Sequence, residues 1–176
     1  VRKSIVDALQ TAIASLKEAA KFEAQLAGLE RMVTEAPQRL AEIERTLLRP
    51  PVELQEPGRS VSLDVLQTQL GEAQAQLAVE DQRLAELESE LERRGKRRTE
   101  APARLATVRQ QLTEVTRQLE IAPEEAPDAA AKREALQAKR GSLEHERRLL
   151  EREVAAYDAT SRLVVAQRDL ATREAA

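Results

Sequence analysis

The longest regular feature of the chain is a seam of mostly apolar residues that repeats in alternating steps of three and four from position 63 to position 119. Charged residues interrupt it only at Glu80, Arg94 and Arg98. A repeat of 3.5 residues keeps one face of a helix turned toward partner helices, which bury it as knobs in holes. The seam therefore predicts a long coiled-coil helix. Its apolar members are Leu63, Leu66, Leu70, Ala73, Leu77, Leu84, Leu87, Leu91, Ala101, Leu105, Val108, Leu112, Val115 and Leu119.

Two proline-rich segments, 49–61 and 121–127, bound this helix. Proline lacks the amide hydrogen and clashes with the preceding turn, so helices end at such segments. Ser62 directly follows the first segment and Asp128 the second, and serine and aspartate are both favoured as N-caps of helices. The sequence therefore predicts three long helices, with proline-rich loops between them. Their expected bounds are about 3–48, 62–120 and 128–174.

The first of these segments carries apolar residues in two registers. Because the earlier stripe is offset from the later seam, we expect a local slip of register near residues 19–22. Pro37 lies inside this segment and Pro102 inside the second, each preceded by Thr-Glu-Ala, and we expect a kink or a break at both. The earlier stripe is Val6, Leu9, Ile13, Leu16 and Ala20, and the later seam is Phe22, Leu26, Leu29, Val33, Ala36, Leu40, Ile43 and Leu47.

Short connections between helices favour antiparallel neighbours. The predicted fold is therefore all-α: an elongated antiparallel bundle or coiled coil of three long helices, kinked near Pro37 and Pro102, that forms a single domain over residues 1–176. Pairing the helices outward from the loops leaves residues near 62–75 without much of the third helix and residues near 110–135 without the first. Expected core residues are Leu84, Leu87, Leu91, Leu105 and Leu112, with Ala129, Leu136, Leu143, Leu150, Tyr157 and Val164 at strict intervals of seven in the third helix.

The composition lacks the residues that most enzymes and metal sites need. There is no cysteine, and the single histidine, His145, has too few neighbours of ligand type for zinc, which takes three or four ligands. No glycine-rich phosphate loop is present. We therefore expect no catalytic, cofactor or metal site, and a protein that is not an enzyme. The net charge of −3 gives no drive toward nucleic acid, and no such partner is expected.

A dense run of positive charge is the most unusual local feature, with five cations in six residues. One interpretation is contact with an anionic partner such as lipid headgroups, a cell-wall polymer or nucleic acid. The other is a solvated helix face whose cations pair with Glu18, Glu151 or Glu153 on neighbouring helices. The candidate anion-contacting residues are Arg93, Arg94, Lys96, Arg97 and Arg98.

The order of motifs along the chain is similar to that of a known family. It runs through Ala8-Leu9-Gln10, Leu16-Lys17-Glu18, Ala36-Pro37, Ser62-Leu63, Ala101-Pro102, Arg104-Leu105, Gln118-Leu119, Ser161-Arg162-Leu163 and Gln167-Arg168-Asp169-Leu170. With its proline-rich loops, this order resembles the N-terminal periplasmic coiled-coil region, the MscS porin domain, of large mechanosensitive channels. The resemblance covers nearly the whole chain.

The resemblance implies the periplasmic part of a bacterial inner-membrane protein that opens under membrane tension. A start at Val1 is expected for a fragment of a longer membrane protein. The implied role is structural or regulatory, supporting assembly and gating. The implied partners are the remainder of the channel chain, neighbouring subunits and periplasmic or cell-wall components. Alternatives are the helical hairpin of a periplasmic efflux or secretion adaptor, the coiled-coil arm of a chromosome-maintenance ATPase, and a self-associating coiled-coil scaffold.

Overall fold

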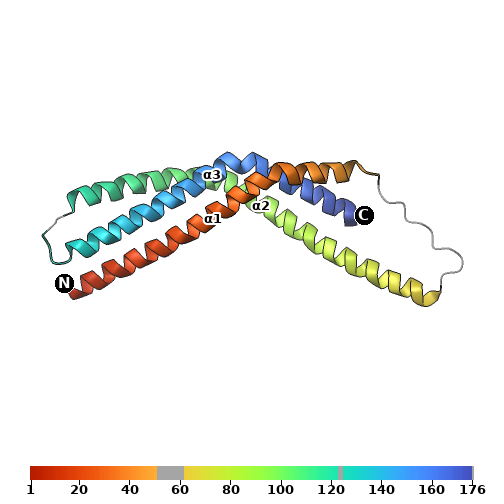
Figure 1. The fold of residues 1–176 in the computed structure, drawn as a ribbon, viewed down its shortest axis with the longest axis horizontal. Coiled ribbons are helices and arrows are strands. Elements are labelled where there is room, and N and C mark those ends of the chain that lie inside the picture. Colours follow the sequence, from red (N-terminus) through yellow and green to blue (C-terminus); the bar gives the residue numbers. More distant parts are fainter. Residues whose placement is uncertain (51–61, 123–124, 176) are drawn as a thin grey trace. The chain divides into compact units, whose positions relative to one another are not determined.

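A computed structural model describes residues 1–50, 62–122 and 125–175. Within these residues the chain forms three helices and no strand: α1 (Arg2–Leu48), α2 (Leu63–Ile121) and α3 (Ala129–Ala175) (Figure 1). The predicted helix bounds differ from these by at most one residue. The expected all-α fold of three long helices is therefore confirmed. The proline-rich loops fall largely on residues 51–61 and 123–124, which lie outside the described residues.

Polar residues cap the starts of α2 and α3. At the start of α2, the backbone N–H of Leu66 donates to the Ser62 carbonyl at 3.1 Å, and the N–H of Val65 donates to Ser62 Oγ at 3.4 Å. At the start of α3, the N–H of Lys132 donates to the Asp128 carbonyl at 3.1 Å. The bond to Ser62 Oγ satisfies an N–H that the start of α2 otherwise leaves without a partner, and the bonds to the two carbonyls are the first of each helix. Ser62 is therefore confirmed as an N-cap. Asp128 lies at the N-cap position, but its carboxylate bonds to Ser4 and Lys132 side chains.

Pro37 and Pro102 both lie inside continuous helices, so neither position is a helix break. The threonine three residues before each proline is also helical and does not begin a new helix. Thr34 Oγ1 donates to the Glu30 carbonyl at 2.8 Å, and Thr99 Oγ1 donates to the Lys96 carbonyl at 3.0 Å. Such bonds back to the preceding turn are typical of threonine within a helix.

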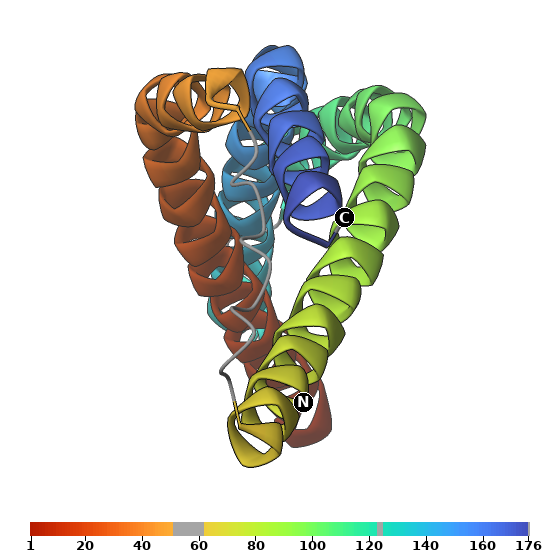
Figure 2. The ribbon, with the colours of Figure 1, turned by 90° about the vertical axis from the view of Figure 1, so that its right-hand side faces the viewer.

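The chain divides into two compact units, each built from a part of all three helices. Unit 1 comprises Val1–Thr34 and Lys96–Tyr157, and unit 2 comprises Glu35–Gly95 and Asp158–Ala176. Within each unit α3 lies between α1 and α2 (Figures 1 and 2). Most of the buried side chains of the described residues accordingly belong to α3, because this helix packs on both neighbours.

The core of unit 1 forms between α2 and α3. Val108 and Val115 are the largest side chains that are completely enclosed, with exposed fractions of 0% and 2%. The predicted seam is therefore confirmed here, although its leucines lie at the edge of the contact and its smaller residues at the centre. Buried members are Ala101, Val108, Val115, Leu143 and Leu150, and Leu105, Leu112, Leu119 and Leu136 pack against them partly buried.

The first half of α1 packs through small residues, and the expected slip of register is wrong. Ala8 and Ala12 are buried against Ala135 of α3. The inward face continues in the register of Phe22, so no slip occurs near residues 19–22. Alanine lets two helix backbones approach closely, which leaves no room for the larger residues of the neighbouring stripe. That stripe is exposed instead: Val6 46%, Leu9 47%, Ile13 53% and Leu16 60%.

In unit 2, a residue of α3 caps the end of α1. The Arg173 guanidinium donates from Nη1 to the carbonyls of Thr46 at 2.9 Å and Leu47 at 2.8 Å, and from Nη2 to the carbonyl of Arg49. The last carbonyls of a helix lack intrahelical partners and carry partial negative charge, so a cation there is favourable. The predicted core leucines Leu84, Leu87 and Leu91 are half-buried in this unit.

Two stretches were expected to lack one helix as a partner, one in each unit. Residues 63–79 of α2 are all exposed, as expected for a segment without much of the third helix. The corresponding expectation for residues 110–135 is wrong for its part in α3, because α1 reaches the start of that helix. There Ser4 Oγ donates to the Asp128 carboxylate, and Ala12 packs against Ala135.

Candidate functional site

The first two arginines of the basic run, in unit 2, share one carboxylate of their own helix. Arg93 donates from Nε and Nη2 to Glu90, both at 2.8 Å, and Arg94 donates from Nε to Glu90 Oε1 at 2.7 Å. Hydrogen bonds from Arg93 are the main cause that lowers the pKa of Glu90 below its ordinary value, with Arg94 adding to them against partial burial. The Arg94 side chain, on the seam, is only 13% exposed, whereas that of Arg93 is 63% exposed.

Arg97 and Arg98 of the run, in unit 1, contact α3, and Lys96 is exposed. Arg97 donates to Glu153 through two parallel hydrogen bonds, from Nε at 2.8 Å and from Nη2 at 2.6 Å, and lies 3.8 Å from Glu100. This two-point contact raises the pKa of the Arg97 guanidinium above its usual range. The Arg98 guanidinium lies over the Tyr157 ring, 5.4 Å from its centre, which is within the range of a cation–π contact.

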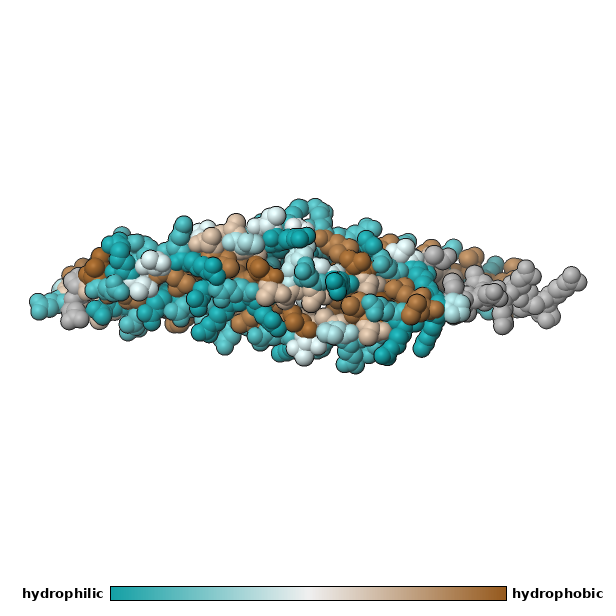
Figure 3. Space-filling model, turned by 90° about the horizontal axis from the view of Figure 1, so that it is seen from above, coloured by the Kyte–Doolittle hydropathy of each residue, from teal (hydrophilic) through white to brown (hydrophobic). Residues whose placement is uncertain are grey.

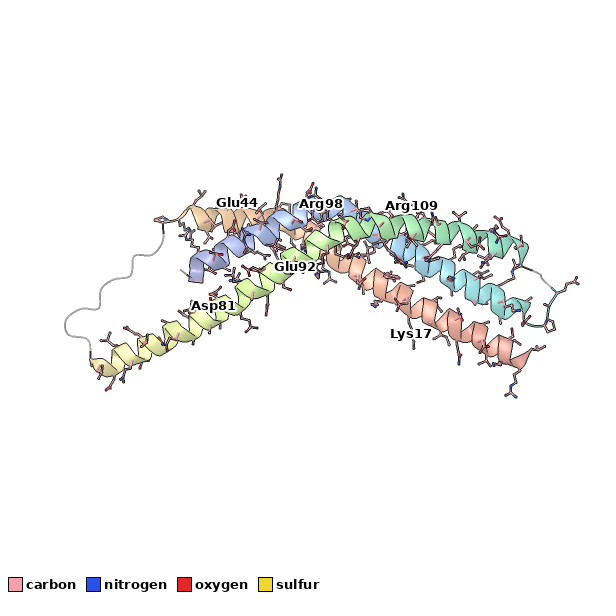
Figure 4. All side chains as sticks on the ribbon, turned by 180° about the vertical axis from the view of Figure 1, so that it is seen from behind. Lys17, Glu44, Asp81, Glu92, Arg98 and Arg109 are labelled. Carbon is pink, nitrogen blue, oxygen red and sulfur yellow. The ribbon has the colours of Figure 1, made fainter. Side chains whose placement is uncertain are left out.

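Arginine–glutamate pairs between α2 and α3 continue beyond the basic run. Arg104 donates to both carboxylate oxygens of Glu146, at 2.6 and 3.0 Å, and Arg109 donates to Glu151 at 3.0 Å. The Glu146 side chain is only 11% exposed. Figure 4 shows Arg98 and Arg109 along α2. Two-point guanidinium–carboxylate contacts are strong and directional, so they fix how the two helices align.

Two of these arginines, Arg97 and Arg104, are seven residues apart, a spacing that could have been found in the sequence. Each of the two comes directly before a position of the seam. Arg83, two heptads before Arg97, also precedes a seam position, and in unit 2 it donates to Glu174 of α3 at 3.1 Å. Positions that flank a coiled-coil seam commonly carry such interhelical pairs. Of the expected partners, the structure brings Glu153 to Arg97, and it brings Glu151 to Arg109 outside the basic run.

The next groups to consider are the possible metal ligands and the histidine in the part of the chain that the structure describes. Within it, no group of three or more His, Asp and Glu residues is placed to hold a metal ion. His145 lies half-buried on α3. Within residues 1–50, 62–122 and 125–175, no helix has a stretch both long and apolar enough to cross a bilayer.

Comparison with known proteins gives one family. The model of the mechanosensitive ion channel porin domain matches residues 1–176, the whole length of the chain. No curated protein and no solved structure matches the chain. The match agrees with the long helical seams and the proline-rich loops described above, on which the resemblance rests. The chain therefore belongs to the mechanosensitive ion channel porin domain family.

Proposed function

We propose that this chain is a non-catalytic, periplasmic structural domain of a mechanosensitive channel, which supports channel assembly and gating by holding its helices in one fixed register. The observation that carries the proposal is that an apolar core and arginine–glutamate pairs join α2 to α3 along the same stretch of unit 1. Val108 is completely enclosed, and it lies between two cross-helix pairs, Arg97–Glu153 and Arg109–Glu151. A domain that transmits position or force must resist sliding of its helices.

The two kinds of contact act together against sliding. Moving α2 along α3 by one turn, about 5.4 Å, removes Val108 and Val115 from the core and separates the charged pairs. Each partly exposed pair contributes only about 1 kcal/mol or less. The apolar core therefore supplies most of the stability, and the arginine–glutamate pairs select the register.

The channel role rests on membership of the family, and the partners follow from it. They are the remainder of the channel chain and its neighbouring subunits. The basic run is the candidate contact for an anionic periplasmic or cell-wall component, mainly through the exposed side chain of Arg93. Within this proposal Arg97 also holds α2 on α3, so its loss affects the domain even where no anion binds.

Charge exchange in the complete channel tests the proposed function. Arg104→Glu and Glu146→Arg each place like charges at the tight pair, so each is expected to change the tension at which the channel opens. The double exchange restores an attractive pair, and the threshold should return toward that of the wild type. The measurement is patch-clamp recording under controlled pressure, with surface expression quantified. Unchanged thresholds and assembly in both single variants would contradict the proposal.

A further inference from the structure

The boundary between the two units crosses all three helices. It falls at residues 34–35 of α1, 95–96 of α2 and 157–158 of α3. A helix that belongs to two units either joins them rigidly or bends between them. Which of these occurs depends on the backbone hydrogen bonds and the packing at the three crossings.

The two prolines that lie inside the described helices are both close to a crossing. Pro37 of α1 and Pro102 of α2 each end the sequence Thr-Glu-Ala-Pro, and both are exposed, so packing does not require them. Proline has no N–H to donate to the carbonyl four residues earlier, and its ring crowds that carbonyl. The carbonyls concerned belong to Val33 and Arg98, within three residues of the crossings. Both helices are therefore weakened at the boundary, and proline is a common cause of kinks.

The apolar seam of α2 is interrupted at the same crossing. Arg94 and Arg98 occupy two consecutive seam positions, so the seam has no apolar residue between Leu91 and Ala101, where the buried core of unit 1 begins. Gly95 lies between the two arginines, and a methyl group there would meet no other atom within 4 Å. Packing therefore does not require this glycine, which weakens a helix relative to alanine. Neither apolar seam contacts nor backbone preference stiffen α2 at this point.

The third helix crosses the boundary without proline or glycine, but with residues of low helix propensity. Asp158, Thr160 and Ser161 follow the crossing directly. The Ser161 hydroxyl is enclosed and has no hydrogen-bond partner among the described residues. A serine hydroxyl that bonds back to the preceding turn bends a helix. This helix therefore stays continuous across the boundary and has the means to curve.

We propose that the boundary is a hinge, at which α1 and α2 bend beside their prolines, α3 curves, and the two units reorient as separate bodies. The arginine–glutamate pairs described above do not oppose this motion, because each pair between α2 and α3 lies within one unit. The register of the helices is thus held inside each unit while the units move. The inference concerns the isolated chain and does not depend on the proposed channel role.

Distances between spin labels test the hinge, and the absence of cysteine from the chain allows labels at chosen sites. Cysteines in place of the exposed Glu88 and Gln110 report across the boundary on α2. Cysteines in place of the exposed Lys139 and Ala155 report within unit 1. Double electron–electron resonance should give a broader distribution of distances for the first pair, and equally narrow distributions would overturn the proposal. Because apolar side chains (brown) stand among hydrophilic ones on the face drawn in Figure 3, labelled chains are diluted into unlabelled ones to exclude distances between copies.

A stiffened boundary should remove the motion. The triple variant Pro37→Ala/Gly95→Ala/Pro102→Ala restores two backbone N–H groups and raises helix propensity, so the distribution across the boundary should narrow to the width seen within unit 1. The matched control is Gly28→Ala/Gly141→Ala, which also adds methyl groups in open space, but inside unit 1. An unchanged width in the triple variant, or equal narrowing in the control, would overturn the proposal. Circular dichroism verifies that each variant is helical.

The single variant Pro37→Ala distinguishes a joint of the whole boundary from a soft point in one helix. In a joint, a stiffer α1 restricts both units, so the distribution measured between positions 88 and 110 of α2 should narrow as well. If that distribution keeps the wild-type width, α2 bends independently of α1, and the hinge is overturned.

Discussion

At the scale of single residues, the degree of burial decides how much each side chain contributes to the stability of the fold. Val108 is completely enclosed, whereas Val79 on the same helix is 63% exposed. Val108→Ala should lower the free energy of unfolding by about 2–3 kcal/mol, because it removes buried methyl groups and leaves a cavity. The same substitution at Val79 should change it by less than about 0.5 kcal/mol. Urea denaturation measures both, and equal losses would mean that the core is assigned wrongly.

A second prediction concerns the contact between alanines of α1 and α3. Ala12→Leu should destabilise the fold by about 1–3 kcal/mol, because the leucine must fit between two closely packed helices. The matched control is Ala20→Leu, at an exposed position of the same helix, which should be nearly neutral. If Ala20→Leu instead lowered the midpoint of thermal unfolding more than Ala12→Leu, the stripe of larger residues would be the face that packs on α3.

The same stretch shows why bulk alone misleads a sequence-based prediction. Val6, Leu9, Ile13 and Leu16 form the stronger apolar stripe, yet small residues one position away face the core. Alanine occurs on both faces of α1, so its periodicity carries little signal. The choice between the two faces depends on how closely α3 approaches α1. This distance is a property of the pair of helices and cannot be read from the sequence of either helix alone.

At the scale of elements, the helix ends and the seams of α2 and α3 could be predicted, because prolines and a strict heptad act locally. The partners of the charged residues were harder to predict. Glu153 and Glu151 were expected at about the right depth, but Glu146 was missed, because its pairing with Arg104 depends on the relative register of two distant helices. The seven-residue spacing of Arg97 and Arg104 beside the seam could have indicated the arginine of this pair, but not its glutamate partner.

The N-cap of α3 predicts a specific response to acid. Lys132, and then the Ser4 hydroxyl, lower the pKa of Asp128 below its ordinary value of 3.8. The folded carboxyl therefore holds its charge more strongly than the unfolded one, and this stabilisation is present above pH 3.8 and lost as pH falls through the folded pKa. Asp128→Asn keeps a polar side chain of the same shape but removes the charge.

The midpoint of thermal unfolding of the wild type should accordingly exceed that of Asp128→Asn at pH 7, and the difference should shrink below pH 3.8. Ser4→Ala removes one donor to the carboxylate and should reduce the difference at pH 7 as well. A gap between wild type and Asp128→Asn that is the same at pH 7 and at pH 3 would show that the carboxylate charge contributes nothing to stability.

At the scale of the whole molecule, stability is expected to be uneven along α2. Residues 101–119 have a core of enclosed valines and leucine contacts, whereas residues 63–79 have none of their side chains buried. Backbone amides in a helix without packing open easily and exchange with solvent. Hydrogen exchange should therefore be at least about tenfold slower over residues 101–119 than over residues 63–79 at low protein concentration.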